Sequence, residues 1–196
     1  LEWLGEKKLR RVLVRLTLLL TIFGITLSTM HQSSLGALFL IVPSKLHPLW
    51  YSSYLPIFFF VSSIAAGLSM VIFEGTLAHR SYADKMDDEH KRTADTVVLG
   101  FGKAAAFVLA AYFAIKVFGV ALDDNWHLLG TNYGLWFLLE MLGFVALPCF
   151  LFAVGVRDLN LTLIRWAAFV TVLGIILNRF NICLIAFNWQ LPAADR

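Results

Sequence analysis

A run of hydrogen-bonding side chains interrupts the first apolar stretch of this sequence. The residues MHQSS at 30–34 place His31, Gln32, Ser33 and Ser34 where their neighbours on both sides are apolar. Lipid offers such groups no hydrogen-bond partner, so their presence at membrane depth suggests a function. A histidine exchanges protons near neutral pH, and amides and hydroxyls donate hydrogen bonds. We therefore expect His31 to bind a ligand or to transfer a proton.

A second group of polar residues lies in the C-terminal apolar stretches, at the same expected depth as His31. It consists of Glu140, Asn178, Arg179 and Asn181. Quinone carbonyls accept hydrogen bonds and quinone reduction takes up protons, so a layer of His, Gln, Asn and an acid-base pair suits a quinone headgroup. We predict three catalytic residues, His31, Glu140 and Arg179. The predicted quinone-binding residues are His31, Gln32, Ser33, Asn178 and Asn181.

Two further ionisable residues, Glu74 and Lys103, fall nearer the opposite face. They are predicted to pass protons between that face and the quinone layer. Structural interpretations stay open for several of these charges. Glu140 and Arg179 can form a buried ion pair that only holds two helices together. The amines of Lys103 and Lys116 are expected to extend to the nearest interface, and Glu74 can reach headgroups in the same way.

The elements that must position these residues are transmembrane helices. The chain has 196 residues, is 59% hydrophobic and only 15% charged, and has a mean hydropathy of +0.76. Apolar blocks of about 20 residues match the hydrocarbon thickness of a bilayer. We predict an all-α polytopic bundle with five spans, at 14–36, 55–78, 96–118, 132–156 and 163–187. The first block stays apolar to Val42, so we expect its end to bend or to lie along the interface.

The loop charges predict the orientation of the chain. Eleven Lys and Arg residues lie on one predicted side of the membrane, near the start of the first span or in and beside the loops 79–95 and 157–162. Only two lie in the segments predicted for the other side. Positive charge favours the cytoplasm. We therefore expect a cytoplasmic basic segment at 1–13, a five-helix region containing a four-helix bundle at 14–187, and a periplasmic tail at 188–196. An outer aromatic belt is predicted from Trp50, Tyr51, Tyr54, Trp126 and Tyr133.

Other cofactors and partners receive little support from the composition. The net charge is +3, and the basic residues cluster at span ends. We therefore expect the chain to contact membrane lipid and not to bind nucleic acid. Cys149 and Cys183 lie inside apolar runs and allow no zinc or iron-sulfur ligand set, so no metal site is predicted. A haem between helices usually needs a histidine from each of two spans, and only His31 lies within one. We expect no haem in this chain.

Several motifs resemble a known family of membrane subunits. They are TMHQSSLG at 29–36, KLHPLW at 45–50 and VIFEG at 71–75, with Glu140 in WFLLE and Arg179 before IAFN at 185–188. Together they resemble the NrfD family of polysulfide reductase membrane subunits, and within it the HybB-type subunits of nickel-iron hydrogenases. The resemblance covers about residues 12 to 190. It identifies the chain as the later part of a longer subunit, in which the family's earlier helices and a final helix have no counterpart here.

The resemblance implies eight to ten helices in the whole subunit, no haem, and a site for menaquinone or ubiquinone near the outer face. It also implies a ferredoxin-like iron-sulfur partner subunit on the periplasmic side. Hydrogenase, molybdopterin or multihaem cytochrome c subunits would belong to the same complex in the bacterial inner membrane. Electrons would pass between that partner and the quinone pool, and in one version of the reaction protons would cross the membrane.

Two other functions compete with the redox interpretation. A transporter or channel also places charges at membrane depth, but we find no inverted repeat in the sequence. A structural anchor would use the polar groups only as contacts between helices. The sequence leaves open the quinone type, the direction of electron flow and the side from which protons are taken.

Overall fold

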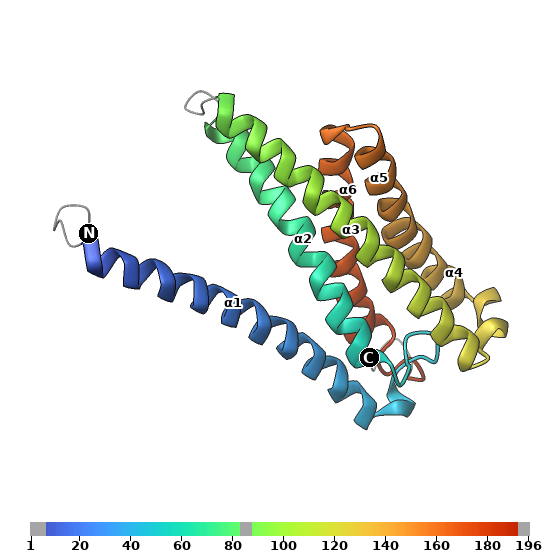
Figure 1. The fold of residues 1–196 in the computed structure, drawn as a ribbon. Coiled ribbons are helices and arrows are strands. Elements are labelled where there is room, and N and C mark those ends of the chain that lie inside the picture. Colours follow the sequence, from blue (N-terminus) through green and yellow to red (C-terminus); the bar gives the residue numbers. More distant parts are fainter. Residues whose placement is uncertain (1–6, 83–87, 192–196) are drawn as a thin grey trace.

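The computed structural model describes residues 7–82 and 88–191, and it confirms an all-helical chain (Figure 1). Five helices are long and apolar enough to cross a membrane, which confirms the predicted number of spans. These spans cover Val12–Ile41, Leu55–Ser81, Arg92–Leu122, Asn132–Arg157 and Leu161–Ile185. The chain is therefore a multi-pass membrane protein.

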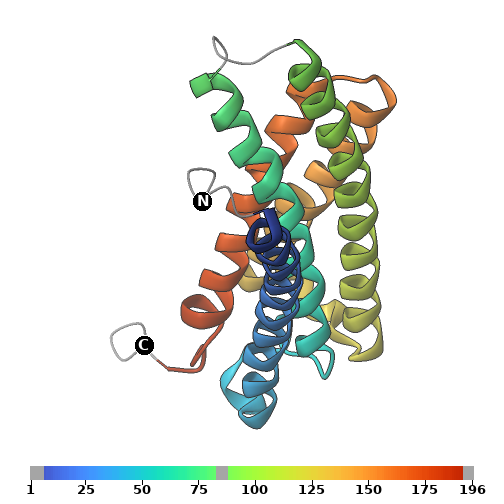
Figure 2. The same cartoon turned by 60° about the vertical axis from the view of Figure 1, so that its left-hand side comes forward.

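Helix α1 (Lys7–Leu38) diverges from the other helices along most of its length (Figure 1), and in Figure 2 its N-terminal part comes forward in front of the bundle. It meets α2 (Leu55–Tyr82) near its C-terminal end, where Gly36 faces the first turn of α2. A Cβ on Gly36 would lie 2.8 Å from the carbonyl oxygen of Leu55, so only glycine allows this close approach. After Leu38 the chain continues in two short turns, Phe39–Ile41 and Pro43–Lys45, which is where the sequence predicted a bend.

Four long helical segments form the bundle beside α1. They are α2, α3 (Asp88–Leu122), the segment from α4 (Asn132–Leu138) through η6 (Leu139–Ala146) to α5 (Leu147–Arg157), and α6 (Leu161–Phe180) with η7 (Asn181–Ile185). Small residues let these helices approach closely. A Cβ on Gly174 would lie only 2.6 Å from Cβ of Phe144 on the neighbouring segment. This is the packing expected in lipid, where small interface residues replace a hydrophobic driving force.

The segments η6 and η7 are π-helical, and each carries a polar residue of the predicted layer. Glu140 lies in η6 and Asn181 begins η7. Pro148 follows η6 and has no N–H to donate to the preceding turn, which is one cause of the wider winding there. A π-turn inserts a residue and so rotates the side chains that follow it about the helix axis. The π-turns therefore help to set which way the polar residues face.

Three connecting segments, at 43–54, 123–131 and 186–191, close one end of the bundle, which we call the loop end. The backbone N–H of His47 donates to the carbonyl of Ala186 at 3.0 Å, and that of Asn188 donates to Lys45 at 2.7 Å. The His47 ring is buried, and its centroid lies 4.8 Å from that of Tyr133 and 4.9 Å from that of Trp189. Burial lowers the pKa of His47, which favours its neutral form.

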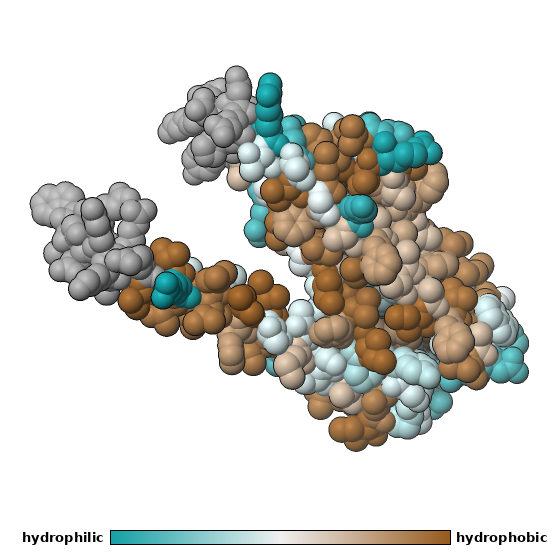
Figure 3. Space-filling model, in the orientation of Figure 1, coloured by the Kyte–Doolittle hydropathy of each residue, from teal (hydrophilic) through white to brown (hydrophobic). Residues whose placement is uncertain are grey.

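Polar surface is concentrated at the two ends of the bundle, and hydrophobic surface covers its middle (Figure 3). The described basic residues of the loops 79–95 and 157–162 and their flanks lie at the end opposite the loop end, among them Arg80, Arg157 and Arg165. The side chains of Lys7, Lys8, Arg10, Arg11, Lys85 and Lys91, and the chain at 1–6 and 192–196, lie outside the described residues. Which end faces the cytoplasm stays a prediction, as do the segments 1–13 and 188–196.

Candidate functional site

The centre of the polar layer is the carboxylate of Glu140, of which 2% is exposed. One of its oxygens, Oε2, accepts hydrogen bonds from Nε1 of Trp50 at 3.0 Å and from Nδ2 of Asn181 at 2.6 Å. The other, Oε1, accepts from Nδ2 of Asn178 at 2.5 Å. Three donors from two separate parts of the chain, the loop that carries Trp50 and the end of the last span, thus converge on one buried acid. Such a network offsets part of the cost of burying a charged or polar group in the membrane.

The two asparagines are themselves held in orientation by further donors. Nε1 of Trp136 donates to Oδ1 of Asn181 at 3.0 Å, and Nη1 of Arg179 donates to Oδ1 of Asn178 at 3.2 Å. Because each amide oxygen is occupied, each amide nitrogen points to Glu140. Asn178 therefore connects Glu140 to Arg179. No ion pair within 4.0 Å joins the described residues Glu140 and Arg179 directly. The ion pair considered from the sequence is therefore replaced by a hydrogen-bonded connection through Asn178.

The guanidinium of Arg179 is anchored on α2. Its Nη2 donates to Oγ of Ser62 at 2.7 Å and to the carbonyl of Phe59 at 3.4 Å. The Phe59 ring lies below it, with 3.6 Å between Cζ of Arg179 and the ring centroid. Stacking on an aromatic ring stabilises a cation that is largely removed from water. Of the five N–H donors of the guanidinium, these bonds and the one to Asn178 leave two for another acceptor.

Arg179 lines a groove of about 530 Å³ between α1, α2 and α6. Its other polar lining residues are Ser28, Gln32 and Ser63, and its walls include Met70, Val172 and Ile176. The groove is open along the surface between α1 and the bundle, so an amphipathic ligand can enter from the side. The predicted residues Gln32 and Arg179 come together here, from the first and the last spans.

The remaining predicted residues of α1 lie differently. His31 is exposed and is not among the residues that line the groove, because one residue along a helix turns the side chain by about 100°. Ser33 is half-buried, and Ser34 donates its hydroxyl to the carbonyl of Met30 at 3.1 Å. The roles predicted for His31 and Ser33 stay predictions.

Glu74 and Lys103, the predicted proton pathway, are both exposed, on α2 and α3 respectively. Neither takes part in the Glu140 network. Within residues 7–82 and 88–191, no group of three or more His, Cys, Asp or Glu side chains could hold a metal ion.

Sequence reasoning misplaced two residues near the site. Trp50 was expected in an interfacial belt, but it is 0% exposed and donates to Glu140, because the loop that carries it folds back into the bundle. Lys116 was expected to extend to the interface, but it is 3% exposed and its Nζ lies between two phenylalanine rings. The belt prediction holds better for Trp126 and Tyr54, whose side chains are exposed. No sequence signal distinguishes these outcomes, since hydropathy gives the depth of a residue and not its direction.

The chain was compared with known proteins, and residues 2–189 match the family described as Polysulphide reductase, NrfD. A protein of Nitratidesulfovibrio vulgaris, without a functional description, is 67% identical over 196 residues, which are 100% of this chain and 50% of the relative. The Escherichia coli K12 protein described as "Probable Ni/Fe-hydrogenase 2 b-type cytochrome subunit" is 28% identical over 190 residues, 95% of this chain and 47% of the relative. No solved structure matches the chain.

The chain thus spans about half the length of the curated relatives it matches. The family match covers nearly all of it and includes Gln32, Glu140 and Arg179. The resemblance predicted from the sequence is therefore confirmed, and the chain belongs to the NrfD polysulphide reductase family of membrane subunits.

Proposed function

We propose that this chain is part of a membrane subunit that exchanges electrons with quinone in a respiratory oxidoreductase complex. The observation that carries the proposal is the groove lined by Gln32 and Arg179, with the buried acid Glu140 one hydrogen-bonded residue away. Membership in the NrfD family and similarity to a protein described as a hydrogenase cytochrome subunit support it. The ligand would be menaquinone or ubiquinone.

The groove fits a quinone headgroup in size and in chemistry. Its volume of about 530 Å³ is in the range of small-molecule sites, and its mostly apolar walls suit a ring with an isoprenoid tail. Arg179 has uncommitted N–H donors and Gln32 has an amide, so both can donate to carbonyl oxygens. When bound, the quinone would supply the redox chemistry.

The chain's own residues have distinct proposed roles. Arg179 and Gln32 bind and orient the headgroup, and Ser62 and Phe59 hold Arg179 in place. Glu140 holds a proton or releases it, and the three donors from Trp50, Asn178 and Asn181 keep its carboxylate fixed when it is ionised. Asn178 connects the acid to the guanidinium. The exposed His31, Glu74 and Lys103 retain their predicted proton-transfer roles as proposals.

The loop end is proposed to face the periplasm of a bacterial inner membrane, in line with the distribution of Lys and Arg. A ferredoxin-like iron-sulfur subunit docked there would exchange electrons with the quinone. Hydrogenase, molybdopterin or multihaem cytochrome c subunits would complete the complex. Proton translocation across the membrane is proposed as a consequence if Glu74 and Lys103 carry protons from the other face.

The test is quinone reduction by the intact complex, with reduced benzyl viologen as donor and menadione as acceptor. Gln32→Leu removes a neutral hydrogen bond to the quinone and is expected to raise the KM for quinone about 2- to 10-fold. His31→Ala tests the role proposed for the neighbouring exposed residue on the same helix. Thr26→Val, whose hydroxyl only bonds to the carbonyl of Ile22, is the matched control on α1. Unchanged kinetics in both Gln32→Leu and His31→Ala, with the complex assembled, would favour a structural anchor.

A further inference from the structure

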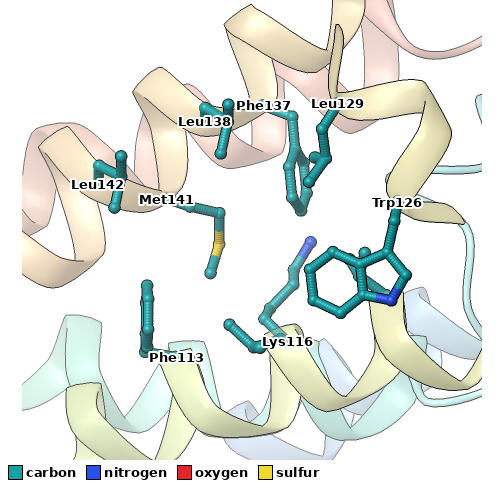
Figure 4. Close-up of a pocket in the computed structure, with 10 residues that line it drawn as sticks. Phe113, Lys116, Trp126, Leu129, Phe137, Leu138, Met141 and Leu142 are labelled. Carbon is teal, nitrogen blue, oxygen red and sulfur yellow. The ribbon is translucent and has the colours of Figure 1, made fainter.

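Lys116 is a buried amine in the middle of the loop-end half of α3. It is 3% exposed, and its Nζ has no hydrogen-bond partner among the residues that the structure describes. The nitrogen lies 5.2 Å from the ring centroid of Phe58 and 5.1 Å from that of Phe137. Figure 4 shows the amine rising from its helix toward Phe137, with Trp126 beside it. Aromatic faces attract a cation, but they replace only part of the hydration that an ammonium group loses on burial.

Packing alone does not explain a buried lysine, because its ammonium group loses hydration on burial. A methionine would fill the same volume among Phe113, Met141 and Leu142 at no electrostatic cost, since the slot of about 80 Å³ that Lys116 lines has only apolar neighbours. The charged groups that act on the amine electrostatically are Glu140 from η6 and Arg179 from α6. The amine is thus within the field of the acid at the centre of the site.

Polar groups lie on both sides of Lys116 along one face of α3. Tyr112 lies one turn before it on α3, and Asp123 directly follows the end of α3 and continues its winding, since its N–H donates to the carbonyl of Gly119 at 3.1 Å; these spacings of four and seven residues share a face. A cavity of about 10 Å³ toward the loop end is lined by Lys116 and includes Ser52, Tyr51, Asp123 and Asn125 in its wall.

A second cavity of about 10 Å³ is lined by Tyr112, Glu140, Asn178 and Ser62. Each cavity is close to the size that holds one water molecule, and each has polar groups to bind it. Asp123 is exposed at the rim. Lys116 therefore lines the cavity beside Asp123 and lies one helix turn from Tyr112, which lines the cavity of the buried carboxyl group.

We propose that Lys116 carries protons between water at the loop end and Glu140. The ammonium group of Lys116 gives a proton to the carboxylate of Glu140 by way of the cavity that Tyr112 and Glu140 line, which leaves a neutral amine and a carboxylic acid. The amine then takes a proton through water in the cavity beside Asp123, and that water regains a proton from the solvent at the loop end. The sequence runs backwards when Glu140 releases its proton. This inference rests on the proposed function and deepens it, because it takes the protons of the quinone reaction from the loop-end side in place of the route through Glu74 and Lys103.

The test follows protonation of Glu140 without any quinone. In the intact complex, the infrared carbonyl stretch of the protonated acid is recorded after a rapid drop in pH, and Glu140→Gln identifies the band by its loss. Lys116→Met is expected to slow the rise of the band at least about tenfold, as loss of a proton-transfer group does. Lys45→Met removes an exposed lysine at the same end and is expected to leave the rate unchanged.

The Lys116→Arg variant distinguishes a proton-transfer role of residue 116 from a role of its positive charge alone. Arginine keeps the positive charge but does not release its proton, so proton transfer through residue 116 predicts a slow band in this variant too. A normal rate in Lys116→Arg, a normal rate in Lys116→Met, or a Glu140 band that never titrates would each overturn the proposal. If Lys116→Met fails to assemble, Lys116→Arg alone decides. A wild-type complex that does not reduce menadione would overturn the proposed function and leave the infrared result standing.

Discussion

Replacing Arg179 by methionine is expected to lower quinone reduction by the intact complex about 10- to 100-fold. A hydrogen bond from a charged donor contributes about 1.5 to 3 kcal/mol, which corresponds to that range. The guanidinium is the one cation among the described residues that line the groove, and it is already oriented by Ser62 and Asn178. The measurement is turnover of menadione with reduced benzyl viologen, at several quinone concentrations.

Arg165→Met is the matched control for this variant. Arg165 lies on the same helix α6 near the opposite end, where it pairs with Asp95 at 3.7 Å, and a partly exposed pair of this kind contributes little. Arg179→Lys keeps the charge but loses the planar set of donors, so intermediate turnover is expected. Wild-type kinetics in Arg179→Met would show that the groove does not hold the reacting quinone.

Replacing Glu140 by leucine is expected to destabilise the protein by at least about 3 kcal/mol, because three buried donors lose their acceptor and each unmet donor costs about 1 to 3 kcal/mol. Those donors are Nε1 of Trp50, Nδ2 of Asn178 and Nδ2 of Asn181. Glu140→Gln keeps the shape and one accepting oxygen, so a smaller loss is expected. The measurement is thermal unfolding of the purified complex in detergent.

Leu139→Ala is the control for the neighbouring position in the same π-helical segment. Leu139 is exposed, so its replacement is expected to change stability by no more than about 0.5 kcal/mol. If Glu140→Leu unfolds at the wild-type temperature, the hydrogen bonds to Glu140 contribute nothing to the fold. Stability that is retained in Glu140→Gln together with lost turnover would separate the acid's chemistry from its structural contacts.

Much of the fold was predictable because lipid imposes a simple rule on the sequence. A span must be helical and apolar for about 20 residues, and hydropathy alone therefore locates all five spans. The grouping of Glu140, Asn178 and Asn181 was predictable as well. These residues share a depth, and polar side chains at one depth in adjacent helices find each other because lipid offers no alternative partner.

The rest depended on rotation about helix axes and on the path of a loop. The π-turns in η6 and η7 affect which way Glu140 and Asn181 face, and no composition pattern predicts a π-turn. Trp50 enters the site because its loop folds inward. The long stem of Lys116 allows either an interfacial or a buried amine, and packing against Phe58 and Phe137 decides between them.

The most direct test of the quinone groove is photolabelling of the intact complex with an azidoquinone, followed by mass spectrometry of its peptides. Label is expected on the groove-lining parts of α1, α2 and α6, around Gln32, Met70 and Ile176, and it should be displaced by excess menadione. Label that excess menadione displaces from other parts of the complex, with none on these three segments, would contradict a quinone site in the groove.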